Sequence, residues 1–229
     1  MRYLKLALAC ALMLPAFGCA FGTDYVHINR YTPKASGSSG NGMEVYVAKA
    51  QDNRSEPSYL GQKAGGYVAL EKGLDLSNIV TDSVVSALEN EGYKVSYSEN
   101  PSAAAPGQGV KVLNTSIDEL WTTFVQGFWT VDANARAKLT FELDDQSGRR
   151  LWKKIIGKGD VNSAVAAPPG LFEDALNGAL GKVMDDFRSD IASTEFKNAI
   201  MEGTVIPAAP APVPAPAPAP APVVPAPAK

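Results

Sequence analysis

The chain has 229 residues, with 21 Lys and Arg against 24 Asp and Glu, and its formal net charge at pH 7 is −3. No cluster of basic residues stands out, which argues against nucleic acid as a partner. Both cysteines lie within the first 19 residues, and His27 is the only histidine, expected as a solvated residue of the N-terminal lead-in. The remaining chain therefore holds no disulfide, thiolate metal site or histidine triad, and we expect no cofactor, no metal and no enzymatic activity.

Residues 1–18 have the organisation of a secretory signal. Two basic residues among the first five precede an apolar run that extends to Phe17 and is too short to span a bilayer. The run ends in Gly18-Cys19, and here the sequence resembles a bacterial lipoprotein signal. The alternative is a plain secretory signal cleaved after Gly18.

The lipoprotein resemblance implies that Cys19 becomes the mature N-terminus and carries S-diacylglycerol and an N-acyl chain such as palmitate. Several acyl chains make an effectively permanent membrane anchor. A secreted domain with one unpaired cysteine would be unusual, which favours lipidation over the plain signal. Ala20 rather than Asp follows the cysteine. By resemblance to enterobacterial sorting, this implies the outer membrane, with the domain facing the periplasm.

Two low-complexity segments flank the expected domain. Residues 19–43 include a Gly- and Ser-rich run and predict a lipidated N-terminus followed by a flexible tether. Residues 204–229 consist almost only of Pro, Ala and Val, which predicts a tail that is disordered or forms polyproline II. The sequence thus predicts a signal peptide at 1–18, a tether at 19–43, one domain at 44–203 and a tail at 204–229.

The apolar pattern between these segments predicts an α+β domain. Strands at 44–49 and 93–97 flank a helix at 75–91, and a right-handed crossover makes such a β-α-β unit parallel. Long strands at 110–125, 129–143 and 149–161 follow as an antiparallel meander. Helices at 169–190 and 195–200 end the domain, and packing the helices on one face of the sheet buries their apolar stripes.

Specific positions follow from the strand alternation. Odd residues from Trp129 to Leu143 are apolar and are expected to face the core. The apolar positions of the 110–125 strand change parity, which predicts a β-bulge near Leu113. Ile155 is expected to anchor the third long strand together with its apolar neighbours. Pro169 is expected at the first position of the following helix.

Three features are candidates for binding. An Arg54 fork after the first strand can clamp a carboxylate, although the alternative is a local pair with Asp52 that orders the loop. Phe128 falls on the polar parity at a hairpin turn and can offer an aromatic surface to a sugar or partner. Asp118 and Glu119 are adjacent in a strand, so alternation predicts that they point to opposite faces and cannot act together.

Several short segments, in order, resemble the YajG-type outer-membrane lipoproteins. They are Asp52-Asn53-Arg54, Leu74-Asp75-Leu76, Glu91-Gly92-Tyr93-Lys94-Val95, Val125-Gln126-Gly127, Lys138 to Phe141, Ala175-Leu176-Asn177 and Glu195-Phe196. The resemblance covers about residues 44–200 and implies an envelope role, with no catalytic residue. The Pro-Ala tail and the Gly/Ser-rich tether depart from the family pattern.

The sequence therefore predicts a non-enzymatic outer-membrane lipoprotein whose periplasmic domain binds an envelope protein complex or a peptidoglycan fragment. The alternative is an auxiliary subunit of an envelope transport or secretion assembly, which would use a sheet edge or the Phe128 face. A concave pocket with converging polar groups favours ligand binding. A flat apolar patch favours assembly.

Overall fold

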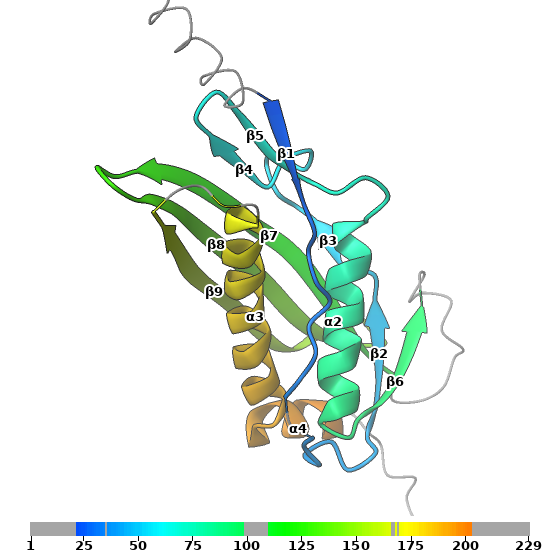
Figure 1. Ribbon diagram of the computed structural model, residues 1–229. Coiled ribbons are helices and arrows are strands. Elements are labelled where there is room, and N and C mark those ends of the chain that lie inside the picture. Colours follow the sequence, from blue (N-terminus) through cyan, green and yellow to red (C-terminus); the bar gives the residue numbers. More distant parts are fainter. Residues whose placement is uncertain (1–21, 35, 99–109, 166–167, 169, 203–229) are drawn as a thin grey trace, which may run out of the picture.

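The computed structural model describes residues 22–34, 36–98, 110–165, 168 and 170–202, which form a mixed sheet with helices on one face (Figure 1). The elements are β1 (Gly22–Val26), β2 (Glu44–Ala48), β3 (Gln51–Asp52), β4 (Gly61–Lys63), β5 (Gly66–Leu70), α2 (Leu76–Asn90), β6 (Lys94–Ser98), β7 (Lys111–Gln126), β8 (Val131–Asp145), β9 (Arg150–Ala164), α3 (Leu171–Ile191) and α4 (Thr194–Met201). The predicted α+β class is confirmed. Cys19, Pro169 and the Pro-Ala tail lie outside the described residues.

The β-α-β unit and the meander both form as the sequence predicts. β2 and β6 pair in parallel, with α2 as the crossover between them. β7, β8 and β9 pair antiparallel in succession. β7 is the central strand, because it pairs with β8 along one edge and with β2, β3 and β4 in turn along the other.

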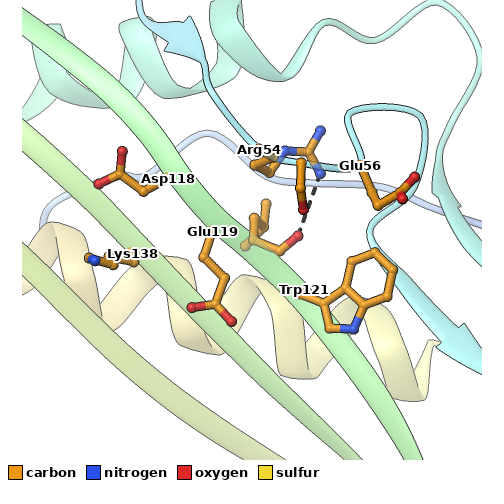
Figure 2. A pocket seen from close by; sticks show the side chains of 8 residues that line it. Arg54, Glu56, Asp118, Glu119, Trp121 and Lys138 are labelled. Atoms are coloured by element: carbon orange, nitrogen blue, oxygen red, sulfur yellow. Dashed lines mark hydrogen bonds between the residues drawn. The ribbon is translucent and has the colours of Figure 1, made fainter.

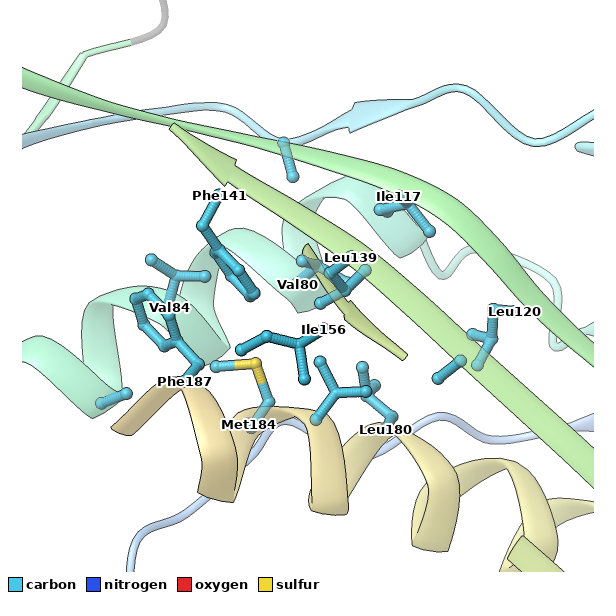
Figure 3. Close-up of a cluster of buried hydrophobic side chains, with 14 of the residues drawn as sticks. Val80, Val84, Ile117, Leu120, Leu139, Phe141, Ile156, Leu180, Met184 and Phe187 are labelled. Atoms are coloured by element: carbon cyan, nitrogen blue, oxygen red, sulfur yellow. The ribbon is translucent and has the colours of Figure 1, made fainter. Parts of the chain in front are cut away.

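The core lies between the sheet and the two long helices (Figure 3). In β8 the odd residues from Ala133 to Leu143 are buried, which confirms the alternation for that stretch. Phe141 is fully buried and stacks on Phe187 of α3, with 4.1 Å between ring centroids. None of the helices in the described ranges combines the length and the apolar content that a membrane crossing needs.

Two side chains predicted for the core are exposed instead. β8 begins at Val131, so Trp129 falls in the hairpin turn and is 76% exposed. Trp152 and Ile156 of β9 are buried, and they lie on the same face of the strand. Because neighbouring strand residues alternate, Ile155 points to the other face and is 55% exposed.

The predicted tether is wrong for the segment that starts at Gly22. β1 pairs in parallel with β5, and Val26 and Ile28 are buried in the core. Past β1 the chain runs between α2 and α3 (Figure 1). Burial of these two apolar side chains stabilises the docked segment. The segment is too short to show a periodic apolar pattern in the sequence.

Polar contacts fix the same segment to α3 and to the end of β5. The backbone N–H of Asn29 donates to Asn177 Oδ1 at 2.8 Å, and the Tyr31 hydroxyl donates to Asp185 Oδ1 at 2.6 Å. His27 Nδ1 lies 2.8 Å from Glu71 Oε2, so this histidine belongs to the fold rather than to a linker. Burial and the bond to Asp185 raise the pKa of Tyr31 to about 12.

The Gly-rich run that follows is packed as well. The N–H groups of Gly37 and Gly40 donate to the carbonyls of Asn90 and Glu91 at 2.9 and 2.6 Å. A Cβ added at Gly40 would lie 2.5 Å from the backbone nitrogen of Tyr93. These glycines therefore allow a close approach of two backbones at the end of α2, where flexibility was predicted.

Asp75 caps the N-terminus of α2. Its Oδ1 accepts the N–H groups of Ser77 and Asn78 at 2.9 and 3.4 Å, and Lys49 Nζ donates to Oδ2 at 2.9 Å. The Lys49 bond first, and then the two backbone bonds, lower the pKa of Asp75. The resulting stabilisation is present above the unfolded-state pKa of about 3.9 and is lost as the pH falls through the lowered folded-state pKa.

We expect Asp75→Ala to reduce the free energy of unfolding by about 1 kcal/mol at pH 7, because the α2 N-cap is lost. The difference from the wild type should shrink as the pH falls through the folded-state pKa of Asp75. Urea titrations at several pH values measure both effects. Asp75→Asn keeps the acceptor oxygen and is the control, and an equal loss in both variants would contradict the capping role.

Candidate functional site

β7 carries a β-bulge at Asp118. Ile117 pairs with Leu139 and Glu119 pairs with Lys138, so Asp118 has no partner residue on β8. The extra residue shifts the strand's alternation, because the buried positions are odd up to Ile117 and even beyond it. The bulge predicted near Leu113 therefore lies five residues further along the strand.

The bulge brings two adjacent carboxylates to one cavity. Asp118 and Glu119 both line it, so the prediction that they point to opposite faces was wrong. A bulge places two consecutive residues outside the regular alternation, which is how neighbours come to share a face. The Thr140 hydroxyl on β8 donates to Asp118 Oδ2 at 2.6 Å and fixes the position of that carboxylate.

The cavity is an open groove of about 300 Å³ between the β3–β4 loop and the middle of β7 (Figure 2), and we call it the bulge groove. Asp118 and Lys138 lie toward one end, Trp121 and Glu56 toward the other, and Glu119 lies between them. The lining residues are Arg54, Ser55, Glu56, Asp118, Glu119, Leu120, Trp121 and Lys138.

Several charged side chains of the bulge groove have no partner among the residues that the structure describes. Glu119 and Lys138 are directly opposite in the strand register, yet they form no ion pair. Across the described residues, neither of them nor Glu56 makes a side-chain hydrogen bond or ion pair. The groove therefore presents unpaired carboxylates and one ammonium group beside an indole ring, a set that can bind amino and carboxylate groups of a ligand.

Arg54 holds the loop and is not free to bind a ligand. Its Nε and Nη2 donate to the two carboxylate oxygens of Asp52, each at 2.8 Å. The other N–H groups donate to the carbonyls of Pro57, Tyr59 and Leu120 at 2.9, 2.8 and 3.5 Å. All five donors of the guanidinium are used, and its side chain is only 6% exposed. The contacts therefore support the local Asp52–Arg54 pair rather than the predicted carboxylate clamp.

Phe128 is separate from the bulge groove. It lies at the tip of the β7–β8 hairpin, which projects beyond the helical layer (Figure 1). The side chains of Phe128 and Trp129 are 89% and 76% exposed and meet edge to face, with 4.8 Å between ring centroids. Seven residues separate Trp121 from Phe128, about 23 Å along a strand, so the tip and the groove are two different surfaces.

The sequence predicted Asp52, Arg54 and Phe128 as binding residues, and it did not predict that Glu119 and Lys138 lie opposite each other in the groove. The available signal was the spacing of Ile117 and Leu120, two apolar residues three apart in a strand, which places a bulge between them. Within the described ranges, no cluster of His, Cys, Asp and Glu is suited to hold a metal ion.

Comparison with known proteins shows that this chain resembles solved structures in its fold. No family model matches the chain, and no curated protein matches it. A Xanthomonas campestris protein of family DUF330 is 11% identical with a TM-score of 0.51, over 78% of this chain and 98% of that one. A Helicobacter pylori homologue of a neuraminyllactose-binding hemagglutinin is 11% identical (TM-score 0.48), over 77% of this chain and 97% of that one. A Neisseria meningitidis lipoprotein is 12% identical (TM-score 0.33), over 64% of this chain and 98% of that one. At these identities the first match supports the fold alone.

Proposed function

We propose that this protein is a non-enzymatic lipoprotein of the bacterial outer membrane, anchored at Cys19, whose domain faces the periplasm. The basic, apolar and Gly18-Cys19 segments of the signal support the anchor. The YajG-type resemblance over residues 44–200 supports a role in the envelope. Within that role, we propose that the bulge groove binds a fragment of the cell wall.

The observation that carries the binding proposal is the group of unpaired charges at the bulge. Peptidoglycan peptides carry free amino and carboxylate groups next to sugars. Glu119 and Glu56 are suited to the amino groups, Lys138 to a carboxylate, and the Trp121 ring to the face of a sugar or an aliphatic stem. An open groove with a few converging polar groups is typical of ligand sites.

We expect muropeptides to bind the purified protein saturably in isothermal titration calorimetry. Glu119→Gln should weaken binding about 10- to 100-fold, because a charge-assisted hydrogen bond contributes about 1.5–3 kcal/mol. Glu89→Gln is the matched control, since Glu89 is an exposed carboxylate on α2, which covers the other face of the sheet. Equal affinity of the Glu119→Gln variant and the wild type would rule out the bulge groove as the site.

The anchor has its own test. We expect Cys19→Ser to leave the protein soluble in the periplasm or unprocessed, because no acyl chain can then be attached. Mass spectrometry of the mature wild-type N-terminus should find a triacylated Cys19. An unmodified N-terminus at Cys19 or Ala20 would refute the anchor and leave the groove proposal to be decided by calorimetry.

The alternative function is an auxiliary subunit of an envelope transport or secretion assembly. The observation that favours it is β9, a 15-residue strand that, among the described strands, pairs only with β8. A partner strand can add to such an edge through backbone hydrogen bonds. Affinity purification from native envelopes that recovers a stoichiometric protein complex, together with no muropeptide binding, would favour this alternative.

A further inference from the structure

The tip of the β7–β8 hairpin is an exposed apolar surface with no charge. The seven residues from Val125 to Val131 read Val-Gln-Gly-Phe-Trp-Thr-Val. Phe128, Trp129 and Val125 are 89%, 76% and 46% exposed. Two large aromatic rings held together at a projecting turn form a surface suited to an apolar environment, and the first ionisable residue of the hairpin is Asp132, opposite Val125.

The strand order puts this tip at the end of the sheet where β1 begins. β1 is parallel to β5, β5 is antiparallel to β4, and β4 is parallel to β7. β7 is therefore antiparallel to β1, and the end of β7 lies at the same end of the sheet as Gly22. Three strand spacings separate β1 from β7, about 14 Å. Figure 1 shows both β1 and the hairpin extending past the N-terminal end of α3.

The strand register shows how far the hairpin tip lies along β7 from the position level with Gly22. Gly22 pairs with Gly66, Gly66 with Lys63, and the preceding residue Gln62 with Thr123. Lys63 follows Gln62, so the level of Gly22 corresponds to Phe124 on β7, and Phe128 lies four residues, about 13 Å, further along that strand. The hairpin tip and the start of β1 therefore lie at the same end of the sheet (Figure 1).

The proposed lipid anchor is close to that end. Only three residues lead from Cys19 to Gly22, and three extended residues span at most about 11 Å. Acyl chains on Cys19 therefore hold the start of β1 close to the bilayer surface, at the end of the sheet where the hairpin tip also lies. Near Gly22, Tyr67 pairs with Thr23, and its ring is 43% exposed.

We propose that the Phe128–Trp129 tip enters the headgroup region of the bilayer that carries the Cys19 anchor, as a second membrane contact that fixes the orientation of the domain. The proposal rests on the proposed lipidation of Cys19. Trp and Tyr rings are enriched at the membrane–water interface, where an apolar ring and a polar N–H or O–H are both satisfied. With an anchor and a tip, the domain has two points on the membrane and cannot rotate freely about its N-terminus.

The test uses the full-length lipidated protein in vesicles of phosphatidylethanolamine and phosphatidylglycerol, with brominated lipids as contact quenchers of tryptophan. The chain has three tryptophans, of which Trp152 is buried and Trp121 lines the bulge groove. We expect brominated lipids to quench the emission of the wild type, and the quenched component to disappear in Trp129→Phe. Phe128→Asp, which keeps the reporter, should lose the quenching because the charge expels the tip.

Ile155→Asp is the matched control, because Ile155 is also apolar and exposed but pairs with Thr140, which lies eleven residues beyond Trp129, roughly 36 Å along the strand from the tip. The Ile155→Asp variant should be quenched like the wild type.

A wild-type protein that floats with the vesicles but shows no Trp129 quenching would overturn the tip contact and leave the anchor intact. A protein that does not float and lacks acylation by mass spectrometry would instead refute the anchor, and this inference with it. Trp129 emission that is shifted in native envelopes but unquenched in lipid vesicles would assign the tip to a protein partner and overturn the proposal.

Discussion

Replacing Phe141 with alanine is expected to lower the free energy of unfolding by about 3–5 kcal/mol. The side chain is fully buried in β8 and stacks on Phe187 of α3, with an angle of 17° between the rings. Its loss removes apolar burial and leaves a cavity between the sheet and the helix, which the surrounding structure fills only in part. Urea unfolding of the wild type and the variant at pH 7 measures the loss.

Ile155→Ala is the control for this prediction. Ile155 is an exposed residue on the opposite face of the neighbouring strand, so its truncation should change stability by no more than about 0.5 kcal/mol. Thr140, next to Phe141, is not neutral, because its hydroxyl donates to Asp118, and Thr140→Ala should cost about 1 kcal/mol. Losses of equal size in Phe141→Ala and Ile155→Ala would mean that the sheet is covered on both faces.

Replacing Arg188 with methionine is expected to cost about 3–5 kcal/mol, because it leaves a buried carboxylate without its partner. Glu91, at the end of α2, is 4% exposed, and its Oε1 accepts the Nε–H of Arg188 at 2.7 Å. The same hydrogen bond raises the pKa of Arg188 above its usual value. The pair joins α2 to α3 at the place where the Gly37 segment packs against Glu91.

A double-mutant cycle separates the pair from its surroundings. Adding Glu91→Gln to Arg188→Met removes the unpaired charge, so the double variant should be more stable than Arg188→Met alone. Thermal or urea unfolding of the four proteins gives the coupling free energy. A cost below about 1 kcal/mol for Arg188→Met would show that the Glu91 carboxylate reaches water and behaves as a surface group.

The parts of the fold that the sequence predicts well are those with a sustained period. A helix was expected at 75–91, and α2 runs from Leu76 to Asn90, with Asp75 as its cap and Gly92 at a φ of 84° just after its end. The alternation of β8 likewise places Phe141 and its odd-numbered neighbours in the core. In both cases the local preference and the tertiary packing agree.

The parts that the sequence does not predict depend on contacts between distant segments. Val26 and Ile28 are two apolar residues in a polar stretch, too few to show a period, and their burial depends on helices formed much later in the chain. The bulge groove depends on a loop that meets the middle of β7, so neither Glu119 nor Lys138 stands out locally. The local periodicity of a sequence does not predict contacts between segments that are far apart in the chain.

The segment from His27 to Tyr31 also constrains the order in which the parts of the domain can fold. Its partners on α3 are Glu173, Asn177 and Asp185, 146 to 154 residues further along the chain. A chain that emerges from its N-terminus, as in synthesis, delivers this segment among the first and α3 among the last. Closing so long a loop carries a high entropic cost until the sheet has formed. This segment is therefore expected to dock last, after nearly the whole chain has emerged.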